Sequence, residues 1–229
     1  MTILSLILFG SRARGDASPE SDVDLLGWTD DEFPGHVRHG STSVALYPGE
    51  LLMRLAAQGD LFAAHLALEA VPLHDPGDLL SRLRGAYAPR REHGTTIAAA
   101  SDLAWFLVDH HTALSSGLVN ARAAWCARTI AIARTAESGM LRFAPSALAA
   151  AVDSETLPVL LARRDDASSF EDEIPMLKRF VERHGRNRPF GTEDASMRRY
   201  ADLFSDTGNA FARKTISSSG LKDRSGSYL

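Results

Sequence analysis

Two short polar motifs near the start of the chain, each joined to an apolar segment, constrain the fold most strongly. The apolar run Ile3–Phe9 ends at Gly10 and Ser11, and Asp22 and Asp24 open the next apolar segment ten residues later. Short apolar runs bounded by glycine and polar residues are typical of buried strands. We therefore expect two strands with a polar connection between them, and the motif residues at the strand ends.

The two aspartates of the second motif have a spacing that suits a cation. Residues two apart on a strand point to the same face, so Asp22 and Asp24 are expected to present both carboxylates together. Carboxylate oxygens are hard ligands that suit Mg²⁺ or Mn²⁺, and Mg²⁺ commonly completes its shell with phosphate and water. An isolated Asp-x-Asp pair is also common on protein surfaces, so the spacing gains meaning only with the first motif.

The first motif supplies groups that bind phosphate. Gly10 allows the backbone to approach a phosphate closely, and Ser11 adds a hydroxyl and an amide donor. Arg12 and Arg14 follow in a basic connection and are candidates to pair with phosphate oxygens. Both motifs together predict a site for a nucleoside triphosphate and its divalent metal.

The run Phe9-Gly10-Ser11, the ten-residue spacer and Asp22-Val23-Asp24 resemble the nucleotidyltransferase superfamily of the DNA polymerase β type. The form is similar to that of prokaryotic minimal nucleotidyltransferases and aminoglycoside nucleotidyltransferases. The resemblance implies an α+β fold with a polymerase β-like sheet, followed here by an α-helical bundle domain. It also implies Mg²⁺-dependent transfer of a nucleoside monophosphate from an NTP, with ATP as the first candidate, to a hydroxyl acceptor. The acceptor is unknown and could be a protein, a small molecule or RNA.

The resemblance assigns residue roles only where the residues match. It implies that Asp22 and Asp24 bind the metal and act in catalysis, and that Gly10 and Ser11 form the nucleotide-binding turn.

This sequence departs from the family pattern at the third carboxylate. Active members usually carry that acid on a later strand, whereas the expected strand Thr42–Tyr47 has none. Glu50, just beyond this strand, is our first candidate for a catalytic substitute; the alternative is an acid favoured by a helix dipole. Asp60 and Glu69 lie on the following helices. His65, close to Glu69, is expected to be a partly buried histidine, with a role near the carboxylates as the alternative.

A missing general base typically costs 10²–10⁴-fold in rate. The alternative function is therefore a catalytically weak nucleotide-binding module. Such a module would act like an antitoxin in a toxin–antitoxin pair, through a protein partner or a homo-oligomer.

The chain divides into a nucleotidyltransferase domain over residues 1–88, an α-helical domain over 95–214, and a flexible tail over 215–229. In the first domain we expect further strands at 23–28 and 71–74, helices at 50–57, 61–70 and 76–86, and a loop at 29–40. In the second we expect helices at 95–111, 118–137, 145–152, 155–162, 168–184 and 193–214.

Bulk composition excludes several classes of protein. The net charge of −4 gives no global basic field for nucleic acid, and the acidic excess lies in the first 90 residues. Cys126 is the single cysteine, which fits a reducing cytoplasm, and its apolar helical setting indicates a buried side chain. The apolar start of the chain is too short to span a bilayer and lacks a signal-peptide pattern, so no membrane association is expected.

A second motif lies near the end of the helical region. Arg179 and His184 form an Arg-x4-His pattern that resembles the ribonuclease motif of HEPN helical domains, which often accompany minimal nucleotidyltransferases. The resemblance implies RNA cleavage with His184 as proton carrier and Arg179 as charge stabiliser. Arg183, Arg186 and Arg188 add positive charge; a solvated helix end explains them as well as a phosphate-facing loop does.

Overall fold

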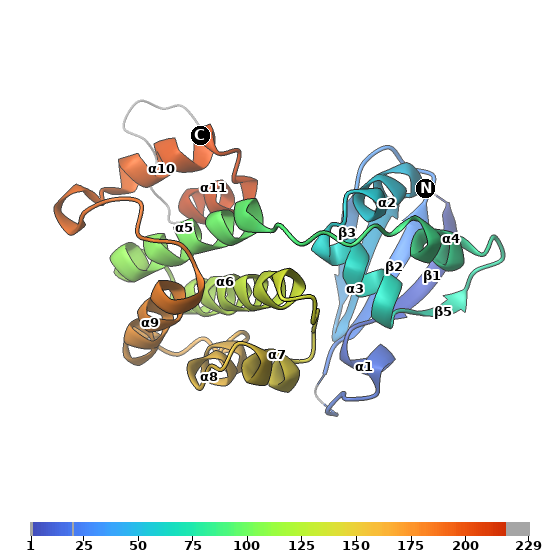
Figure 1. The fold of residues 1–229 in the computed structure, drawn as a ribbon, viewed down its shortest axis with the longest axis horizontal. Helices are drawn as coiled ribbons and strands as arrows, with labels where there is room; N and C mark the ends of the chain where they lie inside the picture. The colour runs from blue at the N-terminus through green and yellow to red at the C-terminus, as the bar shows by residue number, and fades with distance from the viewer. Residues whose placement is uncertain (1, 20, 219–229) are drawn as a thin grey trace. The chain divides into compact units, whose positions relative to one another are not determined.

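The computed structural model describes residues 2–19 and 21–218 and divides the chain into two units, residues 1–91 and 92–229. The first unit holds the sheet and four helices: β1 Ile3–Phe9, α1 Ser11–Arg14, β2 Val23–Thr29, β3 Gly35–His39, β4 Thr42–Pro48, α2 Gly49–Ala57, α3 Leu61–Glu69, β5 Val71–His74 and α4 Leu79–Ala86 (Figure 1). The expected α+β class, with a sheet and its helices followed by a helical region, is confirmed, and the sheet is mixed.

The sheet has the strand order β3-β4-β2-β1-β5. Only β2 and β4 pair in parallel, and every other pair of neighbours is antiparallel. The parallel pair arises because β3 lies between β2 and β4 in the chain, so the chain reverses direction twice before β4 begins. This direction decides which ends of β2 and β4 share a site.

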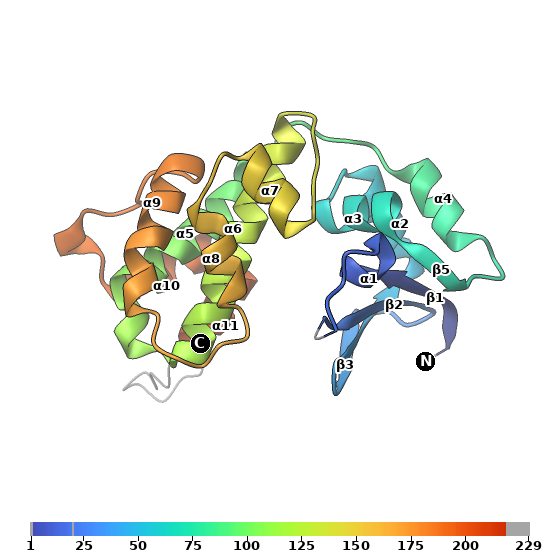
Figure 2. The same cartoon turned by 90° about the horizontal axis from the view of Figure 1, so that it is seen from below.

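Helices α2, α3 and α4 cover one face of the sheet (Figure 2). Their apolar side chains form one core with Ile7, Leu26 and Trp28, which alternate with outward-facing neighbours along β1 and β2. Because residues two apart share a face, Asp24 lies on the same face as Leu26 and Trp28. The site therefore lies on the helix-covered face, at the end where β2 begins.

Two elements of the first unit differ from the sequence prediction. The segment 29–40 was expected to be a loop, but it contains the edge strand β3, which pairs with β4 from Gly35↔Leu46 to His39↔Thr42. All five residues of β3 are exposed, so it has no apolar face that a hydrophobic pattern would reveal. The polar connection after Gly10 contains the single turn α1.

The second unit is helical. Its α-helices are α5 Gly94–His110, α6 Ser116–Glu137, α7 Pro145–Ala151, α8 Thr156–Ala162, α9 Ile174–His184, α10 Met197–Asp206 and α11 Ala210–Ser217. Short 3-10 turns lie at His111–Ala113, Glu171–Glu173 and Thr192–Asp194. One core joins these helices, and Cys126 lies fully buried in it, where burial raises the pKa of its thiol.

The expected helix over 193–214 is two helices, and this is a correction. Gly208 adopts a φ of 65° between α10 and α11, and the side chain of Asn209 accepts a hydrogen bond from the Ala212 amide to begin α11. Of the predicted tail, residues 215–217 end α11 and residues 219–229 lie outside the described residues. Across 2–19 and 21–218, no helix is both long and apolar enough to cross a membrane.

Candidate functional site

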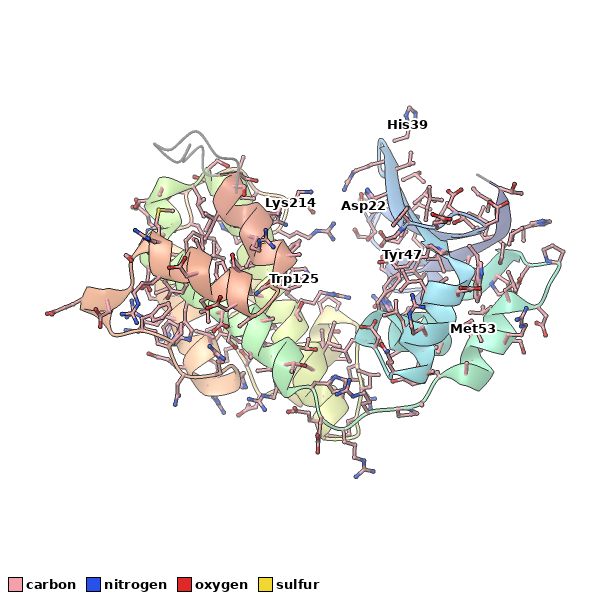
Figure 3. The ribbon with its side chains drawn as sticks, turned by 90° about the horizontal axis from the view of Figure 1, so that it is seen from above. Asp22, His39, Tyr47, Met53, Trp125 and Lys214 are labelled. Atoms are coloured by element: carbon pink, nitrogen blue, oxygen red, sulfur yellow. The ribbon has the colours of Figure 1, made fainter. Side chains whose placement is uncertain are left out.

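The predicted aspartates lie at the end of the sheet where β1 finishes and β2 begins. Asp24 has two Cα partners, Phe9 on β1 and Ser43 on β4, and Asp22 directly precedes β2. In Figure 3, Asp22 lies between His39, at the tip of the β3–β4 hairpin, and Tyr47. We call this region the aspartate end of the sheet.

The backbone of Gly10 lies close to the Asp24 side chain. Its φ is 78°, and a Cβ atom added to it would lie 2.7 Å from Oδ2 of Asp24, so no other residue fits without displacement. The Arg14 amide donates to the Gly10 carbonyl at 3.1 Å and is the first to bond within α1. The amides of residues 11–13 precede that bond and have no acceptor inside the turn. The turn thus presents donors next to a carboxylate, and phosphate binding by Gly10 and Ser11 stays a prediction.

Arg12 and Arg14 both have protein partners that fix the turn. Arg12 donates to the Ser21 carbonyl from Nη2 at 2.7 Å and from Nε at 3.2 Å. Arg14 pairs with Glu69 on α3 at 2.9 Å and with Asp16 at 3.1 Å. Arg12 thus holds the residue before Asp22, and Arg14 ties the turn to a helix; a contact of either residue with phosphate stays a prediction.

Glu69 anchors this connection with a second partner. His65, one turn earlier on α3, places Nε2 3.0 Å from Oε2 of Glu69, and its ring packs edge-on against Phe9. Burial raises the pKa of Glu69, but the hydrogen bonds from His65 and Arg14 outweigh it and hold the pKa below its usual value. His65 and Glu69 therefore support the turn from behind, and His65 is the partly buried histidine that the sequence predicts.

Arg38 on β3 pairs with Asp22, a contact that sequence reasoning did not identify. Its Nη2 lies 3.1 and 3.2 Å from the two oxygens of Asp22. Arg38 is 49% exposed and Asp22 is 20% exposed, so this is a pair at the surface. The guanidinium therefore neutralises one of the two predicted metal ligands.

His36 and Ser43 form a second polar contact at the aspartate end. Nε2 of His36 lies 2.8 Å from Oγ of Ser43. Ser43 is the direct β4 neighbour of Asp24. On its other side, Ser43 pairs with Arg38 of β3. A histidine and a hydroxyl therefore lie beside Asp24 on the strand that was expected to carry a third acid.

The structure does not bring Glu50 to the aspartates. Because β4 runs parallel to β2, Ser43 lies beside Asp24 and Pro48 lies beside Thr29, at the other end of the sheet. That end is about 17 Å away along the strand at the usual rise per residue. Glu50 lies in the first turn of α2 and lines a cavity of about 530 Å³ there. Its position matches the alternative of a helix N-terminal acid.

The aspartate end fits a divalent cation only together with a ligand. Among residues 2–19 and 21–218, no group of three His, Cys, Asp or Glu side chains could hold a metal. Asp22 and Asp24 supply two carboxylates on one face, and Mg²⁺ characteristically binds through one or two carboxylates plus substrate phosphates. The donor set therefore fits Mg²⁺ or Mn²⁺ carried with a triphosphate, after Arg38 leaves Asp22.

The Arg-x4-His motif lies in the second unit. Arg179 and His184 on α9 line a cavity of about 470 Å³ that also contains Arg183, paired with Asp153 at 2.9 Å. The His184 ring packs on Phe180, and burial, together with nearby arginines, lowers its pKa. The two motif residues thus share one cavity, but Asp153 already neutralises one of its cations.

One sequence signal would have revealed the missed residues. The stretch from Gly35 to His39 alternates His36 and Arg38 on one face with Val37 on the other, and Gly40 follows as a turn residue with a φ of 56°. Alternation around a glycine turn is the pattern of a β-hairpin. Reading it would have placed His36 and Arg38 next to the acid-free strand.

Comparison with protein families gives a match that lies within the first unit. Residues 2–52 match the family described as the nucleotidyltransferase domain. A search of curated proteins found no match. Among solved structures, a nucleotidyltransferase-like protein from Exiguobacterium sibiricum 255-15 is 17% identical, with a TM-score of 0.35 over 92% of this chain and 85% of its own.

Proposed function

We propose that this chain, whose N-terminal unit carries a nucleotidyltransferase domain, transfers a nucleoside monophosphate from an NTP to a hydroxyl group and releases pyrophosphate. ATP is the first candidate for the nucleotide. The acceptor is a hydroxyl of a protein, a small molecule or RNA.

One observation carries the proposal. The Gly10 backbone lies so close to Asp24 that a Cβ would come within 2.7 Å of Oδ2. Phosphate donors and a carboxylate are therefore held side by side, as a metal–triphosphate complex requires.

Each residue of the site would have its own role. Ser11 and the amides of residues 11–13 would bind phosphate oxygens, and Arg12 and Arg14 would hold the turn in place. Asp22 and Asp24 would hold Mg²⁺ or Mn²⁺, which when bound supplies positive charge to neutralise the triphosphate. Arg38 would leave Asp22 as the cation arrives and would then lie near the phosphates, where its charge is again balanced.

The test is nucleotide turnover with defined acceptors. Each of the four NTPs, labelled at the α-phosphate, is incubated with the full chain, Mg²⁺ and one of three hydroxyl probes: kanamycin, dephosphorylated casein or an RNA with a free 3′-hydroxyl. We expect pyrophosphate release and label on a probe or on the chain itself, and at least about 10³-fold less of both with Asp24→Asn, because the metal site is lost. Equal turnover in the wild type and Asp24→Asn would contradict the proposal.

A second candidate function rests on the ion pair at Asp22. Arg38 neutralises a predicted metal ligand, and β4 carries Ser43 rather than an acid beside Asp24. Both features suit a nucleotide-binding regulatory module that acts through a protein partner. Mg²⁺-dependent binding of ATP, measured by calorimetry, with no pyrophosphate release for any probe would favour this function over transfer.

A further inference from the structure

The pair formed by His36 and Ser43 has no structural task that explains it. Both β3 and β4 are already joined by backbone pairing from Gly35↔Leu46 to His39↔Thr42. His36 is exposed, so the contact covers little apolar surface. An exposed side-chain hydrogen bond of this kind adds at most about 1 kcal/mol to stability.

The pair formed by His36 and Ser43 lies, however, next to the proposed nucleotide site. Strand pairing places Ser43 directly beside Asp24, and Asp24 lies against the turn at Gly10. Ser43 and Asp24 share the face on which the nucleotide is proposed to bind. His36 lies one strand further out, with Nε2 2.8 Å from the Ser43 hydroxyl.

The proposed reaction needs a group at this point. An attacking hydroxyl must lose its proton as its oxygen bonds to the α-phosphate, and a positioned base contributes typically 10²–10⁴-fold. Asp22 and Asp24 are used for the cation. No further carboxylate lies at the β4 position beside Asp24, and Glu50 is at the other end of the sheet.

We propose that Ser43 and His36 accept this proton in sequence, with Ser43 contacting the acceptor and His36 acting through Ser43; this inference rests on the proposed function. The acceptor oxygen forms a bond to the α-phosphorus, and the bond from that phosphorus to the bridging oxygen of the β-phosphate breaks. Pyrophosphate leaves with the electron pair. The acceptor proton passes to Oγ of Ser43 while the proton of Ser43 passes to Nε2 of His36, so Ser43 is unchanged at the end.

Charged and titratable groups from β2, β3 and β4 lie around the pair. Asp24 on β2 lies on the same face as the pair, as does Asp22 just before β2, and the proposed cation would neutralise both carboxylates. Arg38 lies on the same face of β3 and pairs with Asp22 here, and in the proposed complex the phosphates would balance its charge. Tyr47 on β4 is uncharged, since burial, and then Asp60, raises the pKa of its hydroxyl.

The test combines four variants with pyrophosphate release. His36→Ala and Ser43→Ala should each lower kcat about 100-fold with little change in KM for the nucleotide. The double variant should lose no more than either single variant, because the two residues act as one unit. Ser43→Asp combined with His36→Ala should recover activity to within about 10-fold of the wild type, because a carboxylate at position 43 accepts the proton directly.

The pH profile distinguishes proton transfer from structural support. Carboxylates titrate at lower pH than imidazoles, so the acidic limb of kcat should move down by more than about one pH unit in the rescued variant. His39→Ala is the matched control: it lies on the same strand but on the other face, and it should keep full activity.

A measurement without nucleotide or metal gives an independent readout. In ¹⁵N spectra of the histidine rings, Nε2 of His36 should be the unprotonated nitrogen that accepts the Ser43 hydroxyl, and its signal should shift in Ser43→Ala. A protonated Nε2 in the neutral ring would overturn the inference, because it could not accept the proton.

The outcomes separate this inference from the proposed function. Full activity in both His36→Ala and Ser43→Ala, with activity lost in Asp24→Asn, would overturn the inference alone. Mass spectrometry that finds a nucleotidyl group on Ser43 would also overturn it, because Ser43 would then be the acceptor. No pyrophosphate release by the wild type with any probe would overturn the proposed function and the inference together.

Discussion

In the second unit Asp109 is 8% exposed and binds both the Arg188 guanidinium and the Tyr200 hydroxyl, the latter at 2.7 Å. In the first unit, Asp22 forms a surface ion pair with Arg38, and the two side chains are 20% and 49% exposed. A buried charge must keep its protein partners, because water cannot reach it to take their place. Exposed charges can exchange partners at small cost. The first arrangement stabilises a fold, and the second can bind a ligand.

The largest expected effect tests the buried side of this comparison. Asp109→Ala leaves the Tyr200 hydroxyl and the Arg188 guanidinium without their shared acceptor, so the second unit should lose about 3–5 kcal/mol in its free energy of unfolding. Urea denaturation followed by circular dichroism measures the loss. Asp194→Ala, which removes an exposed pair with Arg199, should cost less than about 1 kcal/mol. Equal losses in the two variants would remove the distinction that burial makes.

The pH dependence of stability tests the buried charges of the second unit in another way. Burial raises the pKa of Asp102 to about 6, against the opposing effect of Arg186, whose Nε lies 2.7 Å from the carboxylate. The folded state thus holds the proton at a pH where the unfolded chain has released it. This contribution to stability is fully present below the ordinary pKa of 3.8 and is lost as pH rises through about 6.

The measurement is the unfolding free energy of the wild type minus that of Asp102→Asn, between pH 3.5 and pH 7. This difference should fall by up to about 3 kcal/mol with rising pH, since a shift of one pKa unit corresponds to about 1.4 kcal/mol. Other carboxylates titrate equally in both proteins and cancel. A difference that is constant with pH would show that Asp102 does not titrate in this range.

The first unit should respond in binding rather than in stability of the whole chain. Gly10→Ala places a methyl group against Asp24 and requires a strained φ, so the affinity for Mg²⁺–ATP should fall by about 100-fold. Calorimetry measures this affinity. Gly15→Ala is the control, because it shares the positive φ but has open space around the added methyl. An equal loss in both variants would attribute the effect to turn strain alone.

The smallest effect tests whether the surface pair competes with the cation. Arg38→Ala frees Asp22, so the affinity for Mn²⁺ in the absence of nucleotide should rise by no more than about fivefold, as expected for an exposed pair. Paramagnetic relaxation of water measures bound Mn²⁺. Arg54→Ala, at the other end of the sheet, should leave the affinity unchanged. Weaker Mn²⁺ binding in Arg38→Ala would show that the guanidinium organises the site rather than competing for it.

The sequence sufficed for the parts of the site that local chemistry determines. The turn at Gly10 and the strand carrying Asp24 follow from apolar runs and turn residues, and the structure places Gly10 next to Asp24. The direction of β4 relative to β2 could not be predicted from the sequence. A direct reversal from β2 into the next long strand would have brought Glu50 back toward Asp22. The edge strand β3 adds a second reversal and sends Glu50 to the far end.

That strand escaped notice because none of its side chains is buried, so hydrophobic periodicity could not detect it. The partners of Arg12 and Arg14 were equally hidden, since Glu69 lies 55 residues from Arg14 in the chain. Long-range pairing of charges depends on tertiary packing, which a motif does not contain.

The exposed strand β3 has a consequence for how such a domain can change over time. Its backbone is fixed by pairing with β4, while all five of its residues are exposed. Substitutions at positions 36 and 38 therefore alter the chemistry next to Asp22 and Asp24 without disturbing the core. Since most mutations are limited by the stability they remove, this strand is the least constrained route to a new acceptor or a new reaction rate. A library randomised at these two positions would sample new activities on an unchanged scaffold.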